Sequence, residues 1–295
     1  MLRLFLVLVL IGTVSAPLRA ADDAIVRFGL TAVVVRENLR FFDRFAVYLQ
    51  SKINQPVEFV RTRSYQDMMD KLRAEELEFA WICGYPFVQK RDPEFLSLLV
   101  VPIFQGRPQY RSYIIVHRDS PFDSLEDLKD RVFSFSDPNS NSGYLYPRFA
   151  LLQLGYSPER FFRQAFFTYN HAETIEAVAE RVADGGAVES YVWELLSRDR
   201  PEMTQKTRVV GRSPLFGFPP IVAHAAVPSA LRARMTATLT DMPRDVEGHR
   251  LLSDLALDGF GEFPATLFED IGVMARRLGR IRWAGGKVGA IGGGG

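Results

Sequence analysis

The chain has 295 residues, of which 47% are hydrophobic, and it carries 36 Lys and Arg against 35 Asp and Glu. This length allows one large or two modest domains, and the apolar fraction is enough for a substantial core. The formal net charge of +1 provides no basic surface for nucleic acid, which excludes that class of partner. We therefore expect a small-molecule partner that binds at a local site.

Residues 1–20 have the pattern of a secretory signal peptide. An early Arg3 precedes an apolar stretch that is short for a membrane span, and small residues follow it. We predict cleavage after Ala20, and an uncleaved membrane anchor is the alternative. Cleavage removes Arg3 and Arg19, so the net charge changes from +1 to −1.

The mature chain contains a single cysteine, Cys83, so it cannot form an intrachain disulfide. Its stability must then come from the core, which fits an exported protein of this size in a bacterial periplasm. Cys83 continues an apolar strand pattern. We therefore expect a buried thiol, not a nucleophile.

The first part of the chain alternates between predicted strands and helices. Apolar runs at 24–30, 56–62 and 78–84 are typical of buried strands. Apolar residues at helical spacing predict a helix over 37–53, and a second helix begins after Ser64, its predicted N-cap. Strands that alternate with helices at this spacing indicate a parallel α/β sheet.

A second α/β unit follows at about residues 110–212. Extended segments near 104–112 and 213–222 connect the two units, which predicts two lobes with two chain crossings. Beyond residue 224 the pattern predicts helices alone. In such folds the ligand lies beyond the carboxyl ends of the strands, so we expect the site in a cleft between the lobes.

These patterns divide the chain into four parts. We predict a signal peptide, a first lobe built from two separate segments, a second lobe, and a disordered tail. The predicted boundaries are 1–20 for the signal peptide, 21–108 plus 220–284 for the first lobe, 109–219 for the second, and 285–295 for the tail.

The stretch SFSDPNSNSGYLYPRF, residues 134–149, places small polar residues at a predicted strand-to-helix turn. Ser140, Asn141 and Ser142 lie just before the helix. The N–H groups at a helix N-terminus lack backbone partners and carry partial positive charge. An ordinary N-cap needs only one short polar residue. Three in a row favour an anion-binding cradle that needs no lysine.

The segment SLEDLKDRVFSFSDPNSNSGYLYPRFALLQLG resembles the corresponding part of periplasmic phosphate-, phosphite- and phosphonate-binding proteins of ABC transporters. The resemblance continues through EFVRTRSYQDMMDKL, FAWICGYPFV, AFFTYNHAETIEAVA, GGAVESYVWELL and SPLFGFPPIVA, and it covers about residues 25–225 in the same order. It implies the two-lobed type II periplasmic binding protein fold, with two α/β lobes around a ligand cleft.

The resemblance also implies a set of ligand contacts. In this family a loop of the form DP-x-S-[ST]-[ST]-G binds the phosphonyl oxygens, which assigns that role to Ser140, Asn141 and Ser142. Asn141 departs from the hydroxyl residue of many relatives, although its amide can still donate. Tyr85 and His171 match a ligand-facing tyrosine and histidine of the family. Packing between the lobes is the alternative for Tyr85, and helix capping or surface exposure is the alternative for His171.

Three further residues complete the predicted site. Glu189 ends a strand where relatives usually carry Asp, and its carboxylate repels an anion unless it meets a P–OH proton or a ligand cation. The alternative is a solvated carboxylate at a helix start. Tyr191 is a cleft aromatic or a packing residue. Thr31 follows the first strand, where relatives bind through polar or aromatic residues and this chain has AVVV.

The leading functional hypothesis is a periplasmic receptor that captures a phosphonate or phosphite, possibly phosphate, by hinge closure and delivers it to an inner-membrane permease. We expect a monomer without a cofactor, a metal or an enzymatic activity, because the sequence has no competent catalytic set and no cluster at metal-ligand spacing. The alternatives are a ligand sensor that signals to a membrane receptor kinase and a periplasmic hydrolase.

Overall fold

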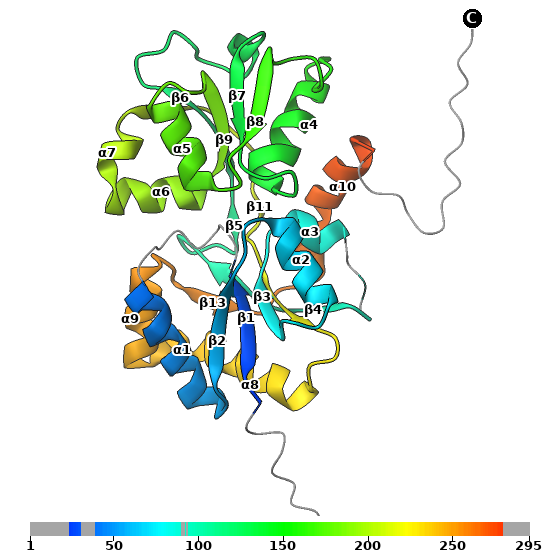
Figure 1. Cartoon of the computed structure of the whole chain (residues 1–295), viewed down its shortest axis with the longest axis vertical. Coiled ribbons are helices and arrows are strands. Elements are labelled where there is room, and N and C mark those ends of the chain that lie inside the picture. Colours follow the sequence, from blue (N-terminus) through cyan, green and yellow to red (C-terminus); the bar gives the residue numbers. More distant parts are fainter. Residues whose placement is uncertain (1–23, 31–38, 90–91, 93, 280–295) are drawn as a thin grey trace, which may run out of the picture.

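A computed structural model describes residues 24–30, 39–89, 92 and 94–279. The chain forms two lobes, each with its own sheet, one above the other in Figure 1. This confirms the predicted class of two α/β lobes. Thr31 falls in residues 31–38, outside the described residues, and so do the predicted signal peptide and tail. No helix in the described part of the chain combines the length and apolar character needed to cross a membrane.

The first lobe contains a six-stranded sheet in the order β13-β4-β12-β3-β1-β2. Strand β1 runs parallel to both β2 and β3, whereas β12 is antiparallel to β3 and β4. The carboxyl ends of β1, β2 and β3 therefore lie at one edge of the sheet. The strand bounds are β1 Val26–Leu30, β2 Val57–Arg61, β3 Phe79–Trp81, β4 Leu96–Ile103, β12 Ile221–His224 and β13 Gly259–Gly261.

The second lobe contains a five-stranded sheet in the order β10-β6-β9-β7-β8. Strand β7 runs parallel to β8 and β9, while β6 is antiparallel to β9 and β10. The carboxyl ends of β7, β8 and β9 consequently lie together as well. The strand bounds are β6 Ser112–His117, β7 Val132–Phe135, β8 Gln164–Phe167, β9 Gly185–Glu189 and β10 Thr207–Arg212.

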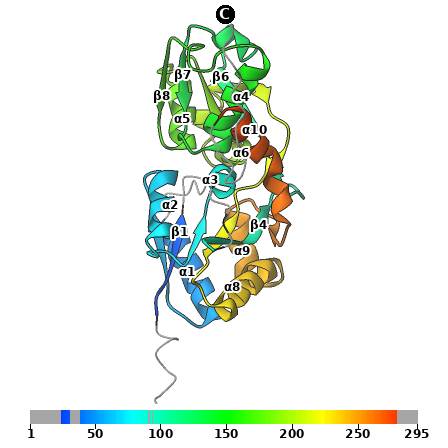
Figure 2. The same cartoon turned by 90° about the vertical axis from the view of Figure 1, so that its right-hand side faces the viewer.

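Helices flank both sheets (Figures 1 and 2). The last helix, α10, packs against α3 of the first lobe and also contacts α4 of the second. The helix bounds are α1 Leu39–Ile53, α2 Tyr65–Arg73, α3 Gly84–Gln89, α4 Tyr146–Gln153, α5 His171–Ala179, α6 Ser190–Asp199, α7 Pro201–Thr204, α8 Ser229–Asp241, α9 Val246–Asp254 and α10 Glu269–Arg277.

Two short strands connect the lobes. Strand β5, Gln109–Tyr110, pairs antiparallel with β11, Phe216–Gly217, and Figure 1 shows them between the two sheets. Both fall within the predicted crossings near 104–112 and 213–222. The lobes are thus connected by a two-stranded ribbon, which is the position expected for a hinge.

The expectation of helices alone beyond residue 224 is wrong, because β13 adds an edge strand to the first sheet by pairing with β4. Its sequence, Gly-Phe-Gly, is too short to show the alternation of a strand, and Gly259 has a φ of +158°. Phe260 is the one residue of β13 with an apolar side chain, and its ring is buried. That ring packs edge-on against Trp81 of β3, with centroids 5.9 Å apart.

Helix α2 illustrates how local sequence and packing agree. The side chain of Ser64 accepts a hydrogen bond from the Asp67 amide at 3.1 Å, which confirms the predicted N-cap. Met68 is completely buried on the inner face of the helix. A Cβ at Gly29 of β1 would lie 2.4 Å from the Met68 sulfur, so the close approach of α2 to the sheet requires glycine there.

The Ser64 cap is testable by substitution. Ser64→Ala removes the side-chain acceptor for the Asp67 amide and should lower the free energy of unfolding by about 1 kcal/mol, measured by urea denaturation. Ser253→Ala is the control, because its hydroxyl only donates to the His249 carbonyl on an exposed part of α9. Equal stabilities for the two variants would contradict the role of Ser64.

Candidate functional site

The turn after β7 has an unusual helical geometry. Residues Asn141–Leu145 form a π turn, in which the Leu145 amide donates to the Ser140 carbonyl at 3.0 Å, and α4 follows directly. The Ser140 hydroxyl accepts from the Gly143 amide at 2.9 Å, so it is the N-cap of this turn. Ser140, Asn141 and Ser142 are all fully buried. The predicted cradle is therefore a buried, wide first turn.

Gly143 is required for this turn by close packing. A Cβ at this position would lie 1.6 Å from the Ser136 hydroxyl oxygen and 2.7 Å from the Ser136 Cβ. No side chain can occupy that space without moving the end of β7. The glycine thus allows the turn to fold back onto the strand that precedes it.

His171 and Glu189 come together because the parallel strands β8 and β9 end at the same edge of the sheet. His171 is the first residue of α5, and Glu189 is the last residue of β9. The Glu189 amide donates to Nδ1 of His171 at 3.1 Å, so a neutral imidazole carries its proton on Nε2. Nε2 lies 3.8 Å from the nearer carboxyl oxygen of Glu189, beyond hydrogen-bond distance.

Burial determines the protonation of both groups. The two side chains are 1% and 0% exposed. Burial lowers the pKa of His171 to about 3, so its imidazole is neutral at neutral pH. Burial also raises the pKa of Glu189 well above its ordinary value of 4.5. The site therefore presents a neutral N–H donor beside a carboxyl group that binds a proton readily.

Several buried polar atoms around this pair have no hydrogen-bond partner. An unpaired buried polar group costs about 1–3 kcal/mol, and most such groups in native proteins are satisfied. Their concentration at the ends of β2, β7, β8 and β9 marks a place where a polar ligand would supply the missing partners. These atoms are Tyr65 Oη, Asn141 Oδ1, Ser142 Oγ, His171 Nε2 and both carboxyl oxygens of Glu189.

Sequence reasoning did not single out Tyr65. It is the first residue of α2 and is 2% exposed. The pKa of its phenol is raised well above 10 by burial and further by the neighbouring Cys83 and Glu189, so this side chain of the first lobe lies close to the carboxyl of the second. Its position after β2, at the shared edge of parallel strands, is the signal that could have identified it.

Asn141 uses its donors for protein contacts. Its backbone N–H points to the Cys83 sulfur at 3.3 Å, and its side-chain amide donates to the Tyr110 hydroxyl at 3.0 Å. Only its Oδ1 lacks a partner. The Ser142 hydroxyl lies beside the same Tyr110 without a hydrogen bond of good geometry. Of the three predicted contacts in the loop, Ser142 has the side chain best placed for a ligand.

The remaining predicted residues lie near this cluster with different surroundings. Tyr85 is buried in the first turn of α3. Cys83 is buried as expected, and burial raises the pKa of its thiol to about 12. The Tyr191 ring packs 5.2 Å from those of Phe104 and Phe218, centroid to centroid. Its hydroxyl donates to the Leu255 carbonyl at 2.7 Å, so packing between the lobes accounts for this residue.

The described residues provide no buried basic side chain to neutralise the cluster. Among them, Arg148 is the single buried Arg or Lys, and its guanidinium bonds to Glu159 and Tyr144. The same part of the chain contains no group of His, Cys, Asp and Glu that could hold a metal ion. The groups that this part of the chain offers to an anion are therefore N–H and O–H donors and the turn before α4.

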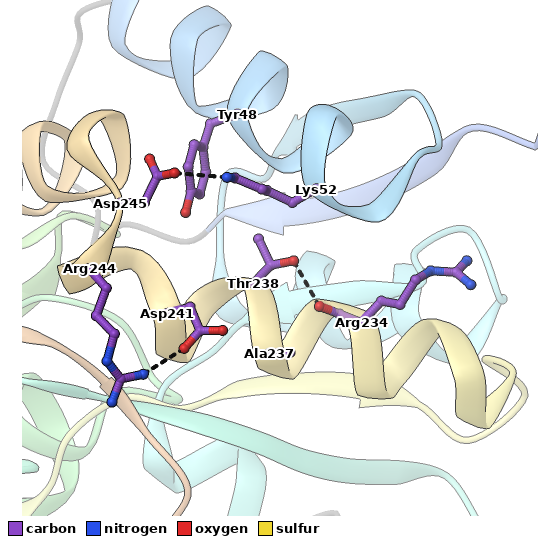
Figure 3. Close-up of a pocket in the computed structure, with 8 residues that line it drawn as sticks. All are labelled: Tyr48, Lys52, Arg234, Ala237, Thr238, Asp241, Arg244 and Asp245. Atoms are coloured by element: carbon purple, nitrogen blue, oxygen red, sulfur yellow. Dashed lines mark hydrogen bonds and ion pairs between the residues drawn. The ribbon is translucent and has the colours of Figure 1, made fainter.

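A hollow lies on the first lobe between α1 and α8 (Figure 3). Four of its five charged groups are paired, because Lys52 bonds to Asp245 at 2.7 Å and Arg244 bonds to Asp241 at 2.7 Å, and the fifth, Arg234, is exposed. It thus lacks the unpaired buried groups that distinguish the cluster between the lobes. Its lining residues are Tyr48, Lys52, Arg234, Ala237, Thr238, Asp241, Arg244 and Asp245.

Comparison with known proteins shows the family of this chain. The family model for the periplasmic substrate-binding protein of phosphonate ABC transporters matches residues 28–266. The chain belongs to this family. The family is a transport component of the periplasm and is not a family of enzymes, and a small-molecule ligand and a membrane permease are its partners.

Two curated relatives are similar over most of the chain. It is 25% identical to the phosphonates-binding periplasmic protein of Escherichia coli K12 over 221 residues, which are 72% of this chain and 64% of the relative. The chain thus spans less than two thirds of that relative's length. It is 23% identical to a probable ABC transporter phosphite binding protein of Prochlorococcus marinus over 253 residues, 82% of this chain and 85% of the relative.

Solved structures confirm the two-lobed fold. A binding protein of an ABC phosphonate transporter from Pseudomonas aeruginosa superposes with a TM-score of 0.79 at 22% identity, covering 86% of each chain. The Prochlorococcus marinus protein in complex with methylphosphonate superposes with a TM-score of 0.77 at 20% identity, covering 87% of this chain and 99% of that one. The predicted type II binding protein fold is therefore confirmed.

The burial of Glu189 predicts a specific dependence of stability on pH. The pKa of Glu189 is raised in the folded protein, so above pH 4.5 the folded state binds more protons than the unfolded state. Its contribution to stability is therefore lost as the pH rises. Glu189→Gln cannot ionise, and it should be more stable than the wild type at pH 7.5, by about 1.4 kcal/mol for each unit of pKa shift.

The difference between the two proteins should shrink as the pH approaches 4.5. Urea denaturation across this range measures it. The contribution of His171 changes over a similar range but is common to both proteins, so it cancels in the difference. The exposed Glu58→Gln serves as the control and should follow the wild type at each pH. Parallel curves for Glu189→Gln and the wild type would show that the carboxyl is solvated in the folded protein.

Proposed function

We propose that this protein captures a small phosphorus oxyanion, a phosphonate or phosphite, between its two lobes for delivery to an ABC transporter. The observation that carries the proposal is the cluster of buried, unpaired polar atoms where the two lobes meet. Its donors come from both lobes, so a ligand held by all of them keeps the lobes together. Membership of the phosphonate-binding family and the methylphosphonate complex of a relative support the choice of ligand.

These donors are neutral groups, and they can bind a tetrahedral anion without help from a positively charged side chain. Hydroxyl groups of Tyr65 and Ser142 and the Nε2–H of His171 can each donate to a different ligand oxygen. A hydrogen bond to a charged group contributes about 1.5–3 kcal/mol. Three of them give about 4.5–9 kcal/mol before the cost of ordering, a range that includes the roughly 8 kcal/mol of a micromolar complex. Nothing in this proposal requires a chemical step, a cofactor or a metal.

Glu189 determines which protonation state of the ligand the site accepts. Its buried carboxyl and a ligand oxygen can share one proton, which either partner can bring. A phosphite or phosphonate monoanion carries that proton on P–OH, and an aminophosphonate can offer an ammonium group to an ionised carboxylate. Sulfate carries neither at neutral pH, so Glu189 itself must bring the proton, and sulfate should bind more weakly. Fully ionised phosphate should bind less well for the same reason.

Calorimetric titration of the mature protein tests the proposal directly. The panel is phosphite, methylphosphonate, 2-aminoethylphosphonate, phosphate and sulfate at fixed salt and pH. We expect micromolar or tighter affinity for one phosphorus oxyanion and weaker binding of sulfate. Ser142→Ala should weaken that affinity about tenfold, because it removes one donor to a charged oxygen. The distant Ser253→Ala should leave it unchanged.

The Glu189→Gln variant tests the proton-sharing role in the same titration. The amide cannot exchange a proton with the ligand, so phosphite should bind more weakly and the preference of the site for phosphite over sulfate should shrink. Binding of 2-aminoethylphosphonate alone by the wild type would instead identify Glu189 as the partner of the amine. Absence of binding across the whole panel would overturn the proposed ligand class.

Export and assembly are also proposals for this chain. We propose that residues 1–20 direct export, that cleavage follows Ala20, and that the mature protein is a monomer. Expression of the full-length chain in a bacterial host, followed by intact mass measurement of the periplasmic fraction and light scattering, checks all three. A membrane-bound product of full mass would favour an uncleaved anchor, and twice the expected mass in solution would exclude the monomer.

A further inference from the structure

The loop from Asp137 to Asn141 makes direct contacts across the two lobes. The Tyr65 amide of the first lobe donates to Oδ2 of Asp137 in the second lobe at 3.0 Å. The Asn141 amide points to the Cys83 sulfur at 3.3 Å, and the Asn139 side chain donates to that of Gln66 at 3.4 Å. The loop predicted as an anion cradle therefore also fastens the second lobe to the first.

The contact of Asp137 with Tyr65 completes the N-terminus of α2. Tyr65 is the first residue of this helix, and the Ser64 cap serves the Asp67 amide instead. The Tyr65 amide has no partner within its own helix, because the first helical N–H groups never do. A carboxylate in line with the N-terminus of a helix also interacts favourably with the helix dipole. The cap on this amide comes from the opposite lobe.

The carboxyl group of Asp137 is held in place by its own loop. Its Oδ1 accepts from the Asn139 amide at 2.7 Å, and Pro138 restricts the backbone between them. The side chain is 3% exposed. This internal bond lies wholly in the second lobe and does not depend on the first. The carboxylate is thus oriented before it meets α2, which lowers the entropic cost of the contact.

Asn141 connects the same loop to the hinge. Its side-chain amide donates at 3.0 Å to the hydroxyl of Tyr110, a residue of β5 in the ribbon between the lobes. Both of its donors therefore serve contacts between parts of the protein. This accounts for asparagine at a position where many relatives carry a hydroxyl residue. The amide side chain is longer than that of serine or threonine, and its N–H group donates to Tyr110 in the hinge.

We propose that the Asp137–Asn141 loop is a closure latch, in which Asp137 caps α2 of the opposite lobe only when the lobes are closed. Asp137 then controls ligand affinity as a positioning residue, without touching the ligand. This inference rests on the proposed function for its effect on affinity, whereas the effect on closure stands without any ligand.

A matched pair of substitutions isolates the N–H group that the latch uses. Tyr65→Pro and Tyr65→Ala both remove the phenol ring, but only proline also removes the amide hydrogen. Proline is tolerated at the first position of a helix. Ser64, the preceding residue, has φ −152° and ψ 163°, which is compatible with a following proline. Any difference between the two variants therefore reports the bond to Asp137.

Cys83 provides a readout of closure that requires no ligand. Its thiol is completely buried and lies under the Asn141 amide of the opposite lobe. Separation of the lobes removes that cover, so the rate of thiol labelling by a small alkylating agent reports the open fraction. It is the only thiol in the chain, so the signal has one source. Small-angle X-ray scattering gives an independent measure of the same opening.

The open fraction of the ligand-free protein and the ligand affinity depend on the same closing equilibrium. Asp137→Ala should therefore raise the labelling rate of Cys83 in the ligand-free protein, weaken the affinity for methylphosphonate, or do both, so that the product of the two factors is about ten. Tyr65→Pro should differ from Tyr65→Ala in the same combined measure, and that difference should vanish when Asp137→Ala is also present. Asp127→Ala is the control. Its carboxylate accepts the Asp123 and Ser124 amides within the second lobe and makes no contact with the first.

Equal labelling together with equal affinity of Asp137→Ala and the wild type, or of the two Tyr65 variants, would overturn the latch. Thermal unfolding of each variant confirms that it is folded before labelling. If the wild type binds no phosphorus oxyanion but Asp137→Ala still opens the protein, the proposed function fails and the latch stands. If scattering shows that the ligand-free wild type is already closed, and Asp137→Ala weakens binding without a change in labelling, the carboxylate contacts the ligand and the latch is wrong.

Discussion

The structure depends on the burial of a polar cluster to which the described residues supply no buried basic side chain. Within this part of the chain, charge compensation comes from N–H and O–H groups, which gather where helices begin and where parallel strands end. The loop before α4, His171 at the start of α5 and Tyr65 at the start of α2 all meet this requirement. The parallel order of β7, β8 and β9 is what brings the second-lobe groups to one edge.

Burial also gives the site its selectivity. A solvated carboxylate beside an anion would only repel it, but Glu189 is enclosed and binds a proton readily. The neutral His171 beside it keeps one defined tautomer because the Glu189 amide occupies its Nδ1. His171 thereby donates a hydrogen bond from Nε2 only, and the Glu189 carboxyl group accepts a proton. Burial of these groups costs free energy of folding, and the same burial allows them to discriminate between ligands.

Much of this could be predicted from the sequence. Strands and helices differ in local periodicity, so their alternation along the chain predicted the two lobes and both crossings. The Ser140–Ser142 turn was recognisable from its run of short polar residues. Tyr65 was not, because its role depends on which strand ends face each other across the lobes. Strand β13 was missed because two of its three residues are glycine, so tertiary pairing with β4 alone defines it.

The aromatic group between the lobes has a thermodynamic consequence. Tyr191 of the second lobe packs on Phe104 and Phe218 and bonds to the Leu255 carbonyl, so the apolar core is continuous from one lobe to the other. Any opening must expose part of this apolar surface to water. Capture of a small polar ion would then carry a negative heat-capacity change, normally the mark of apolar burial. The enthalpy of binding would reflect the motion of the lobes more than the ion itself.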